Sequence, residues 1–169
     1  NRYTPSSRWG GAEQIDGDHL GDADHPRVGV DADGNASAVW KQFDGNTVKI
    51  WANRYSPDVG WGAPERIDTD SEGDALAPRV AVSAIGEAVA VWPQSDGSSY
   101  DVFSNAYTPG SGWGTAVRID SNQQRFGQPV AVEVAIDPNG HAVAAWLRRE
   151  PATVGTGDNP SQIWAARYE

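Results

Sequence analysis

The chain has 169 residues with 23 acidic and 13 basic side chains, which gives a formal net charge of -10 at neutral pH. This length suits one domain with its own hydrophobic core. The negative charge disfavours nucleic acid and anionic membrane surfaces as partners, because binding to phosphate groups relies on Lys and Arg. No apolar run approaches the roughly 20 residues that span a bilayer, so we expect no membrane insertion.

The chain contains no cysteine, which excludes disulfides, thiolate zinc sites and a cysteine nucleophile. It also contains no methionine, so Asn1 is expected to be a processed or trimmed end. Both a secreted protein that has lost its signal peptide and a piece of a longer protein fit this end. The acidic, Trp-rich composition favours a bacterial exported protein, located extracellularly, at the cell surface or in the periplasm.

A phrase of sixteen residues occurs three times, beginning at Asn1, Asn53 and Asn105: "NRYTPSSRWGGAEQID", "NRYSPDVGWGAPERID" and "NAYTPGSGWGTAVRID". A second phrase follows each copy, as "PRVGVDADGNASAVWKQ", "PRVAVSAIGEAVAVWPQ" and "PVAVEVAIDPNGHAVAAWLR". Internal repeats of this kind predict a fold built from similar supersecondary units. We expect a single domain over residues 1–169, with an opening half-unit at 1–16 and units of about 52 to 61 residues beginning near 26, 78 and 129.

Within a unit the side chains alternate with a period of two, as in "EAVAVW" at residues 87–92, which indicates β-strands. Each unit predicts four strands in order, shown in the second unit by "PRVAV", "EAVAVW", "DVFSNAY" and "TAVRID". Gly-rich and Asp-rich stretches such as "DADGN" and "TPGSG" separate them and predict turns. No segment has helical spacing, so the sequence predicts an all-β protein.

A four-stranded antiparallel meander repeated about every 40 to 50 residues is the pattern of a β-propeller blade. We therefore expect three four-stranded blades per chain, with most Trp side chains filling the space between blades. Three blades do not close a ring, and a homodimer joined head to tail would close a six-bladed one. A longer natural chain is the other explanation. A β-trefoil, which also uses three units of four strands and closes as a monomer, is the alternative fold.

The pattern "VAVDxxGNAxAVWxQ" followed by "IWANRYxPxxGWGxAxxID" resembles the tandem repeats of bacterial exported and surface proteins that are taken to be β-propellers, and it covers essentially the whole chain. The hairpin "VDADGNASAVW" is also similar to the Asp-box of sialidase-like propellers. That box serves the fold, so the resemblance implies no catalytic role for Asp31, Asp33, Gly34 or Trp40. The second unit departs from the pattern, because Ser83 and Glu87 replace Asp31 and Asn35.

Two groups of carboxylates suggest glycoside hydrolysis, which uses a pair of acids: Asp16, Asp18, Asp22 and Asp24, and then Asp68, Asp70, Glu72 and Asp74. The third unit has "SNQQRFGQ" at this place, and acids that recur on turn positions are typical of solvated loops, so we expect no enzyme. "DADGN" offers oxygen ligands for calcium but lacks the downstream Glu of a helix-loop-helix site. No cofactor is expected, with calcium as the alternative; His19, His25 and His141 share no ligand spacing.

The remaining function is binding, and the leading expectation is a noncatalytic module for a carbohydrate or surface polymer. Exposed aromatic rings between glycines suit flat sugar faces, and polar residues after the strand-ending Trp are expected on the loop-bearing rim. The candidate ligand-binding residues are Trp9, Trp61, Trp113, Gln42, Gln94 and Arg148. A structural role of the three Trp in their own turns is the competing interpretation. The alternative functions are a protein-interaction scaffold and a fragment of a larger glycan-acting exported protein.

Overall fold

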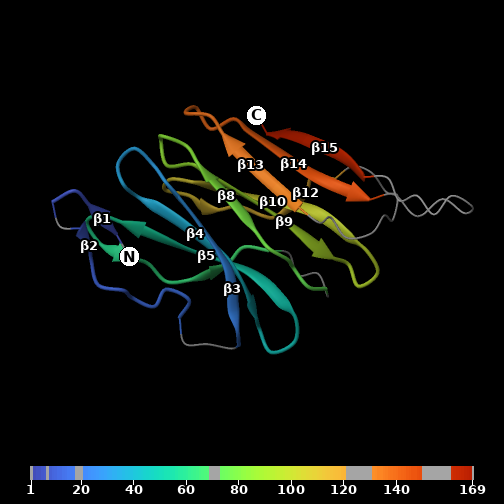
Figure 1. Ribbon diagram of the computed structural model, residues 1–169, viewed down its shortest axis with the longest axis horizontal. Coiled ribbons are helices and arrows are strands. Elements are labelled where there is room, and N and C mark those ends of the chain that lie inside the picture. Colours follow the sequence, from blue (N-terminus) through green and yellow to red (C-terminus); the bar gives the residue numbers. More distant parts are fainter. Residues whose placement is uncertain are drawn as a thin grey trace, which may run out of the picture.

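The computed structural model describes residues 2–6, 8–17, 21–68, 73–120, 131–149 and 161–168. Their regular elements are β-strands, arranged as a short N-terminal hairpin and three antiparallel sheets (Figure 1). Within this described part of the chain, no helix is long and apolar enough to cross a membrane. The structure confirms the all-β class that the period of two predicted.

The strands follow one another along the chain, and each sheet uses strands from one repeat unit. The hairpin consists of β1 (Tyr3–Thr4) and β2 (Arg8–Trp9). The first sheet contains β3 (Ala23–Val30), β4 (Ala36–Phe43), β5 (Val48–Ser56), β6 (Gly60–Trp61) and β7 (Glu65–Arg66). The second contains β8 (Arg79–Val82), β9 (Ala88–Ser95), β10 (Tyr100–Thr108), β11 (Gly112–Trp113) and β12 (Val117–Arg118). The third contains β13 (Ala131–Ile136), β14 (Ala142–Arg149) and β15 (Ser161–Tyr168).

In the first two units the predicted fourth strand, "TAVRID" in the second unit, is shortened to two residues, and a second two-residue strand precedes it; both pair with the third strand. In the second sheet, β11 joins β10 through the pair Tyr107 and Trp113, and β12 joins it through Ser104 and Val117. Gly112 enters β11 with a φ of 86°, in the left-handed region that favours glycine. The "GWG" motif therefore lies on a strand edge, where the sequence placed it in a turn.

The third sheet has three strands among the described residues, in the order β13-β14-β15. The expected four-stranded form is seen in the first two sheets, once the two outer pieces are counted as one strand. The long third-unit segment after β14 and the segment "SNQQRFGQ" fall in residues 150–160 and 121–130, which lie outside the described residues.

The turn between the first two strands of each unit is organised by its first polar side chain. The Asp31 carboxylate accepts hydrogen bonds from the backbone N–H groups of Asp33 at 2.9 Å and Asn35 at 2.8 Å. Asp137 accepts the equivalent pair in the third unit, and the Ser83 hydroxyl accepts one in the second. These contacts give the Asp-box-like residues a role in hairpin geometry.

Two core clusters hold the three sheets together. The first cluster joins Val39, Ile50 and Ala52 of the first sheet to Ala90 and Trp92 of the second. The second cluster joins one face of the second sheet to the third sheet, through Val89, Val91, Val102, Ala142, Ala144 and Trp146. The leading strands β3, β8 and β13 are also in contact in that order. The sheets therefore pack face against face in chain order, as Figure 1 shows.

A buried Asn side chain connects each of two phrases to the phrase before it. The Asn105 side-chain nitrogen donates hydrogen bonds to the carbonyl oxygens of Ile67 at 2.9 Å and Gly114 at 3.0 Å. Asn53 makes the same two contacts with Ile15 and Gly62, at the same distances. The opening segment at residues 8–17 therefore contacts the first sheet in the same way that the end of the first unit contacts the second sheet.

Replacing Asn105 by Ala should lower the free energy of unfolding by about 1–2 kcal/mol, because the buried Ile67 carbonyl and the partly buried Gly114 carbonyl lose their donor. The Asn105 Oδ1 has no hydrogen-bond partner among the described residues, and its removal offsets part of this cost. Urea denaturation would measure the change, with Asn46→Ala in an exposed turn as the control. Equal unfolding midpoints for the two variants would mean that the Asn contact does not stabilise the packing of the units.

Candidate functional site

Three of the candidate binding residues are buried and do not lie on an open rim. The exposed fractions of Gln42, Gln94 and Arg148 are 4%, 0% and 3%. They lie on β4, β9 and β14, two residues after the Trp at which the sequence ended each strand. A side chain two residues further along a strand returns to the same face. That face packs against the preceding unit, which corrects the expected position of all three.

Gln94 and Arg148 each contact the Asp that ends the preceding phrase, and we call these contacts the inter-unit clasp. The Gln94 amide accepts a hydrogen bond from the Trp92 indole at 2.9 Å and donates one to Asp68 at 3.1 Å. Arg148 forms an ion pair with Asp120. Both carboxylates are almost fully covered, with side-chain exposures of 0% and 1%. The "RID" end of the phrase therefore has a structural role between units.

Gln42 departs from this pattern at the first unit. Its amide accepts a hydrogen bond from the Trp40 indole at 3.0 Å, and it donates one to the Gly21 carbonyl at 3.4 Å. Because the polar ends of Gln42, Gln94 and Arg148 are engaged inside the protein, their burial disfavours a role in ligand binding.

Burial changes the protonation of the acids around the clasp. Burial raises the pKa of the Asp68 carboxyl, and the hydrogen bond from Arg66 opposes this change. Burial also raises the pKa of Asp101, against the attraction of Arg118 and Arg148. Arg118 lies 3.0 Å from Asp101 and Arg148 lies 3.7 Å from it, so two cations meet at this carboxylate. These two acids are therefore protonated more readily than exposed ones.

The three phrase Trp residues share one local contact and differ in exposure. Each contacts the Tyr six residues before it in a tilted or edge-to-face arrangement, with ring centroids 5.5, 5.6 and 5.7 Å apart. Trp9 is 67% exposed, whereas Trp61 and Trp113 are half-buried. Trp113 also packs against the first core cluster. A structural role therefore fits Trp113, whereas the Trp9 ring is the most exposed of the three.

A cavity of about 410 Å³ lies between the opening segment and the first sheet, and we call it the aromatic cleft. Tyr3, Trp9, Tyr55 and Trp61 line it together with apolar residues of β3. Two of those, Val28 and Val30, are 62% and 60% exposed. The cleft therefore belongs to the uncovered face of the first sheet.

A second cavity, of about 520 Å³, lies between the first and second sheets, and we call it the polar cleft. Its lining combines turn residues of two units with residues of two phrases, among them Asp31, Asp33, Asn35, Arg54, Tyr55, Ile85 and Tyr107. The Arg54 guanidinium lies 4.0 Å from the centre of the Tyr107 ring and donates a 2.7 Å hydrogen bond to the Ser37 hydroxyl. These contacts fix the Arg54 side chain in the wall of the cleft.

Sequence reasoning selected the Trp of each phrase but missed the Tyr and Arg that line the polar cleft. The available signal was "NRY", where Arg precedes Tyr in the first two phrases. The Arg of one phrase faces the Tyr of the next, as Arg2 does with Tyr55 at 5.9 Å. Only a three-dimensional arrangement of the units reveals that pairing.

The carboxylate groups do not gather into a metal centre in the described part of the chain, where no three His, Asp or Glu side chains are grouped as ligands. Asp18, Asp70, Glu72 and His19 lie outside the described residues. Asp74 accepts a hydrogen bond from the Val48 backbone at 2.8 Å. The calcium alternative and the glycoside-acting alternative stay predictions.

A scan against models of protein families gives no match, and a search of curated proteins gives no significant match. The resemblance to exported repeat proteins therefore stays an interpretation of the motifs.

Replacing Trp113 by Ala should lower the free energy of unfolding by about 2–3 kcal/mol, because it removes a half-buried ring from the first core cluster. For a single copy of the chain in dilute solution, Trp9→Ala should change this free energy by no more than about 0.5 kcal/mol, since most of that ring is exposed. Urea denaturation midpoints of the two variants provide the comparison. Equal losses would contradict the different packing of the two indoles.

Replacing Asp68 by Asn tests the inter-unit clasp through the pH dependence of the free energy of unfolding. The folded-state pKa of Asp68 is raised, so its contribution to stability is fully present below the unfolded-state pKa and is lost as the pH rises through the folded-state value. The stability of the wild type relative to Asp68→Asn should therefore increase as the pH falls from neutral towards about 4.

Asp96→Asn is a control for which we expect the opposite pH dependence of stability. Hydrogen bonds from the backbone of Ser99 and then Ser98 lower the pKa of Asp96, so its contribution is present at neutral pH and is lost as the pH falls. Urea unfolding of Asp68→Asn and Asp96→Asn over this pH range would show opposite trends. Parallel pH curves for wild type and Asp68→Asn would rule out a perturbed carboxyl at the clasp.

Proposed function

We propose that the protein is a noncatalytic binding module for a carbohydrate or surface polymer, and that the polar cleft is its binding site. The observation that carries the proposal is the cavity of about 520 Å³ between two units, in which Tyr rings, a fixed Arg and turn carboxylates meet. Ligand sites of small molecules are concave and combine apolar or aromatic walls with a few placed polar groups.

The chemistry of the lining fits a neutral polyhydroxylated ligand. Asp33 is exposed and offers acceptor oxygens for sugar hydroxyls, while Arg54 offers donors. Hydrogen bonds to charged groups are stronger than those between neutral groups. The overall charge of -10 disfavours an anionic polymer. We therefore place the sugar at Asp33, Arg54 and Tyr55, in preference to Trp113 and to the buried Gln42, Gln94 and Arg148.

We propose a propeller-type arrangement for the scaffold, in preference to a trefoil. Its support is that each described strand ladder joins strands of one unit, while the units meet through their sheet faces. Blades of a propeller are separate sheets of this kind, arranged around an axis. The proposed place of action is outside the cytoplasm, on the basis of the acidic, Cys-free composition.

A protein-interaction scaffold is the second candidate, and exposed apolar side chains favour it. Val28, Val30, Val143 and Ile163 are between 51% and 74% exposed. These residues lie on the first and third sheets, away from the polar cleft, so sugar binding and a protein contact can coexist on one molecule.

A glycan array of the intact protein tests the proposal, followed by titration calorimetry with the glycan that binds best. Asp33→Ala should weaken binding at least about tenfold, or ~1.4 kcal/mol, because it removes a charged hydrogen-bond partner. Tyr55→Phe, which removes one hydroxyl, should weaken it less. Asp58→Ala changes the charge equally in an exposed turn outside the lining and should bind as the wild type does.

A flat array for the wild type would end the carbohydrate proposal. Equal loss in Asp33→Ala and Asp58→Ala would move the site away from the polar cleft, because only the first of these residues lines it.

A further inference from the structure

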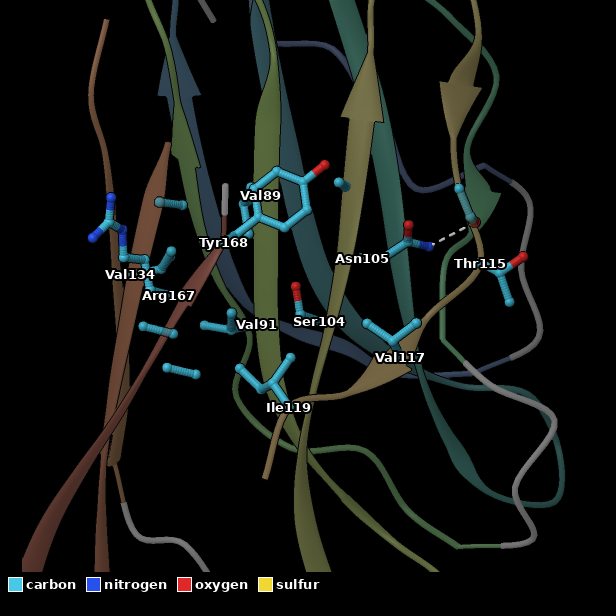
Figure 2. A pocket seen from close by; sticks show the side chains of 15 residues that line it. Val89, Val91, Ser104, Asn105, Thr115, Val117, Ile119, Val134, Arg167 and Tyr168 are labelled. Atoms are coloured by element: carbon cyan, nitrogen blue, oxygen red, sulfur yellow. Dashed lines mark hydrogen bonds between the residues drawn. The ribbon is translucent and has the colours of Figure 1, made fainter. Parts of the chain in front are cut away.

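A cavity with mainly apolar walls lies between the second and third sheets. Its volume is about 250 Å³, and its walls include Val91, Ile119, Val134 and Ala144 (Figure 2). Ala166 and Tyr168 of β15 also line it. An apolar cavity of roughly 150 Å³ accepts a benzene ring, so this one has room for an indole.

The repeat shows what fills the equivalent place between the first and second sheets. The residues that correspond to the four cavity walls are Val39, Ile67, Val80 and Ala90, and all belong to or pack on the first core cluster. Trp113 and Ala116 of the segment "GWGTA" pack on the same cluster. The cavity therefore corresponds to the place that a phrase Trp occupies one unit earlier.

Among the described residues, the third sheet also has no outer strand beside β15 and leaves apolar side chains of one face exposed. β5 and β10 carry β6, β7, β11 and β12 on their outer edges, whereas no described strand pairs with the outer edge of β15. Ile50 and Val102 are 0% exposed, but Ile163 at the same repeat position is 74% exposed. Residues that the fold buries in two units are open in the third.

The opening segment is in the opposite situation, because it is an outer strand that, apart from β1, has no described sheet to pair with. Its "RWGGA" at residues 8–12 repeats "GWGTA", and Asn53 holds Ile15 as Asn105 holds Ile67. The segment is therefore positioned as an outer strand, but no described sheet stands behind it. Val28 and Val30 of the first sheet are more than half exposed, while their repeat equivalents Val80 and Val82 are half-buried against the first sheet.

We propose that the partner for both ends is a second copy of this chain. Residues 8–16 of one copy add to the outer edge of β15 of the other, and Trp9 enters the cavity of that copy. The exposed face of the third sheet, with Val143 and Ile163, covers Val28, Val30 and the aromatic cleft of the first sheet. Burial of apolar surface at both contacts drives the association.

The register of this contact follows from the two internal examples. The pairs Ala52 with Glu65 and Ser104 with Val117 place Glu13 opposite Ala165 of the second copy. The pairs Tyr55 with Trp61 and Tyr107 with Trp113 place Trp9 opposite Tyr168. Tyr168 then replaces Tyr3, and the two residue pairs between β1 and β2 are released.

Within one molecule the two ends cannot meet in this way. The opening segment lies beyond the first sheet and β15 lies beyond the second, so they are at opposite ends of the molecule (Figure 1). Two head-to-tail contacts close a ring when the rotation between copies allows it. Two copies supply six units, within the typical range of about four to eight blades. The polar cleft, between sheets of one copy, stays open.

Paired cysteines test the contact directly, because the chain contains no cysteine of its own. The variant with Glu13→Cys and Ala165→Cys should form disulfide-linked dimers under mild oxidation, since opposite residues of paired strands lie within disulfide reach. The control combines Glu13→Cys with Ser161→Cys, at the other end of β15, and should not cross-link. An intramolecular disulfide, or equal cross-linking of the two variants, would overturn the proposed register.

Light scattering of the uncrosslinked full chain measures the assembly without any sugar. The wild type should have about twice the chain mass of 18.1 kDa at about 100 μM, a concentration well above micromolar dissociation constants. Trp9→Ala should raise the dimer dissociation constant at least about tenfold. A monomeric wild type, or a series of larger oligomers, would overturn the closed pair.

Ala166→Asn provides a gain-of-function variant, because it introduces the Asn that begins each of the three phrases. By analogy with Asn105, the new amide should donate to the Ile119 carbonyl of its own copy and to the Gly10 carbonyl of the other copy. The dimer should therefore become tighter, by about tenfold in dissociation constant. An unchanged or weaker dimer would contradict the proposed contact. Asp33→Ala should leave the mass unchanged, which separates this test from that of sugar binding.

Discussion

The fold depends on one constraint, which is that each sheet is apolar on both faces and both faces must be covered. Val91 and Trp92 are neighbours on β9 and point to opposite faces, yet they are 1% and 0% exposed. A sheet of this kind is stable only between two other layers. Stacking in chain order satisfies the constraint for the second sheet, and it leaves one face of the first sheet and one face of the third to other partners.

The inter-unit clasp sets the position of one sheet on the next. Apolar faces of Ala and Val can slide past one another at little cost, whereas a buried carboxylate requires its partner in one place. Asp68 reaches Gln94, and Asp120 reaches Arg148, from the same repeat positions. The Asn53 and Asn105 side chains add hydrogen bonds to the preceding phrase. The ends of the phrase recur because each unit must engage the next at the same points.

The period of the sequence was enough to predict strands, their order and the turns between them. It was insufficient for the roles of Gln42, Gln94 and Arg148, because it ended the second strand of each unit at the Trp. The strand β9 continues past Pro93 to Ser95, and this extension turns Gln94 inward. Proline is a breaker signal, and nothing local shows that its neighbour is buried. The short strands β6 and β11 at the "GWG" motif were missed because a two-residue strand has no measurable alternation.

Differences between the units are concentrated where the proposed functions lie. The second unit has Ser83, Glu87 and Ala106 where the first has Asp31, Asn35 and Arg54, so these polar side chains of the polar cleft are not repeated at the matching positions. Ala106 also leaves Tyr168 without the guanidinium that covers Tyr107. Asn53 and Asp68, which join units, recur as Asn105 and Asp120, while the turn residues and the Arg that line the polar cleft change.

This division assigns separate tasks to the parts of one phrase. Its first residues place an Arg against the next Tyr, its last residues hold the next sheet, and its Trp fills the space beside the third strand. A ligand site formed between two units can then vary without disturbing the packing, because its polar side chains lie in turns and at the rim. In the proposed pair each copy contributes one polar cleft, so a polymer with repeating sugars would meet two equivalent sites on one assembly, and its affinity would depend on their separation as well as on either site.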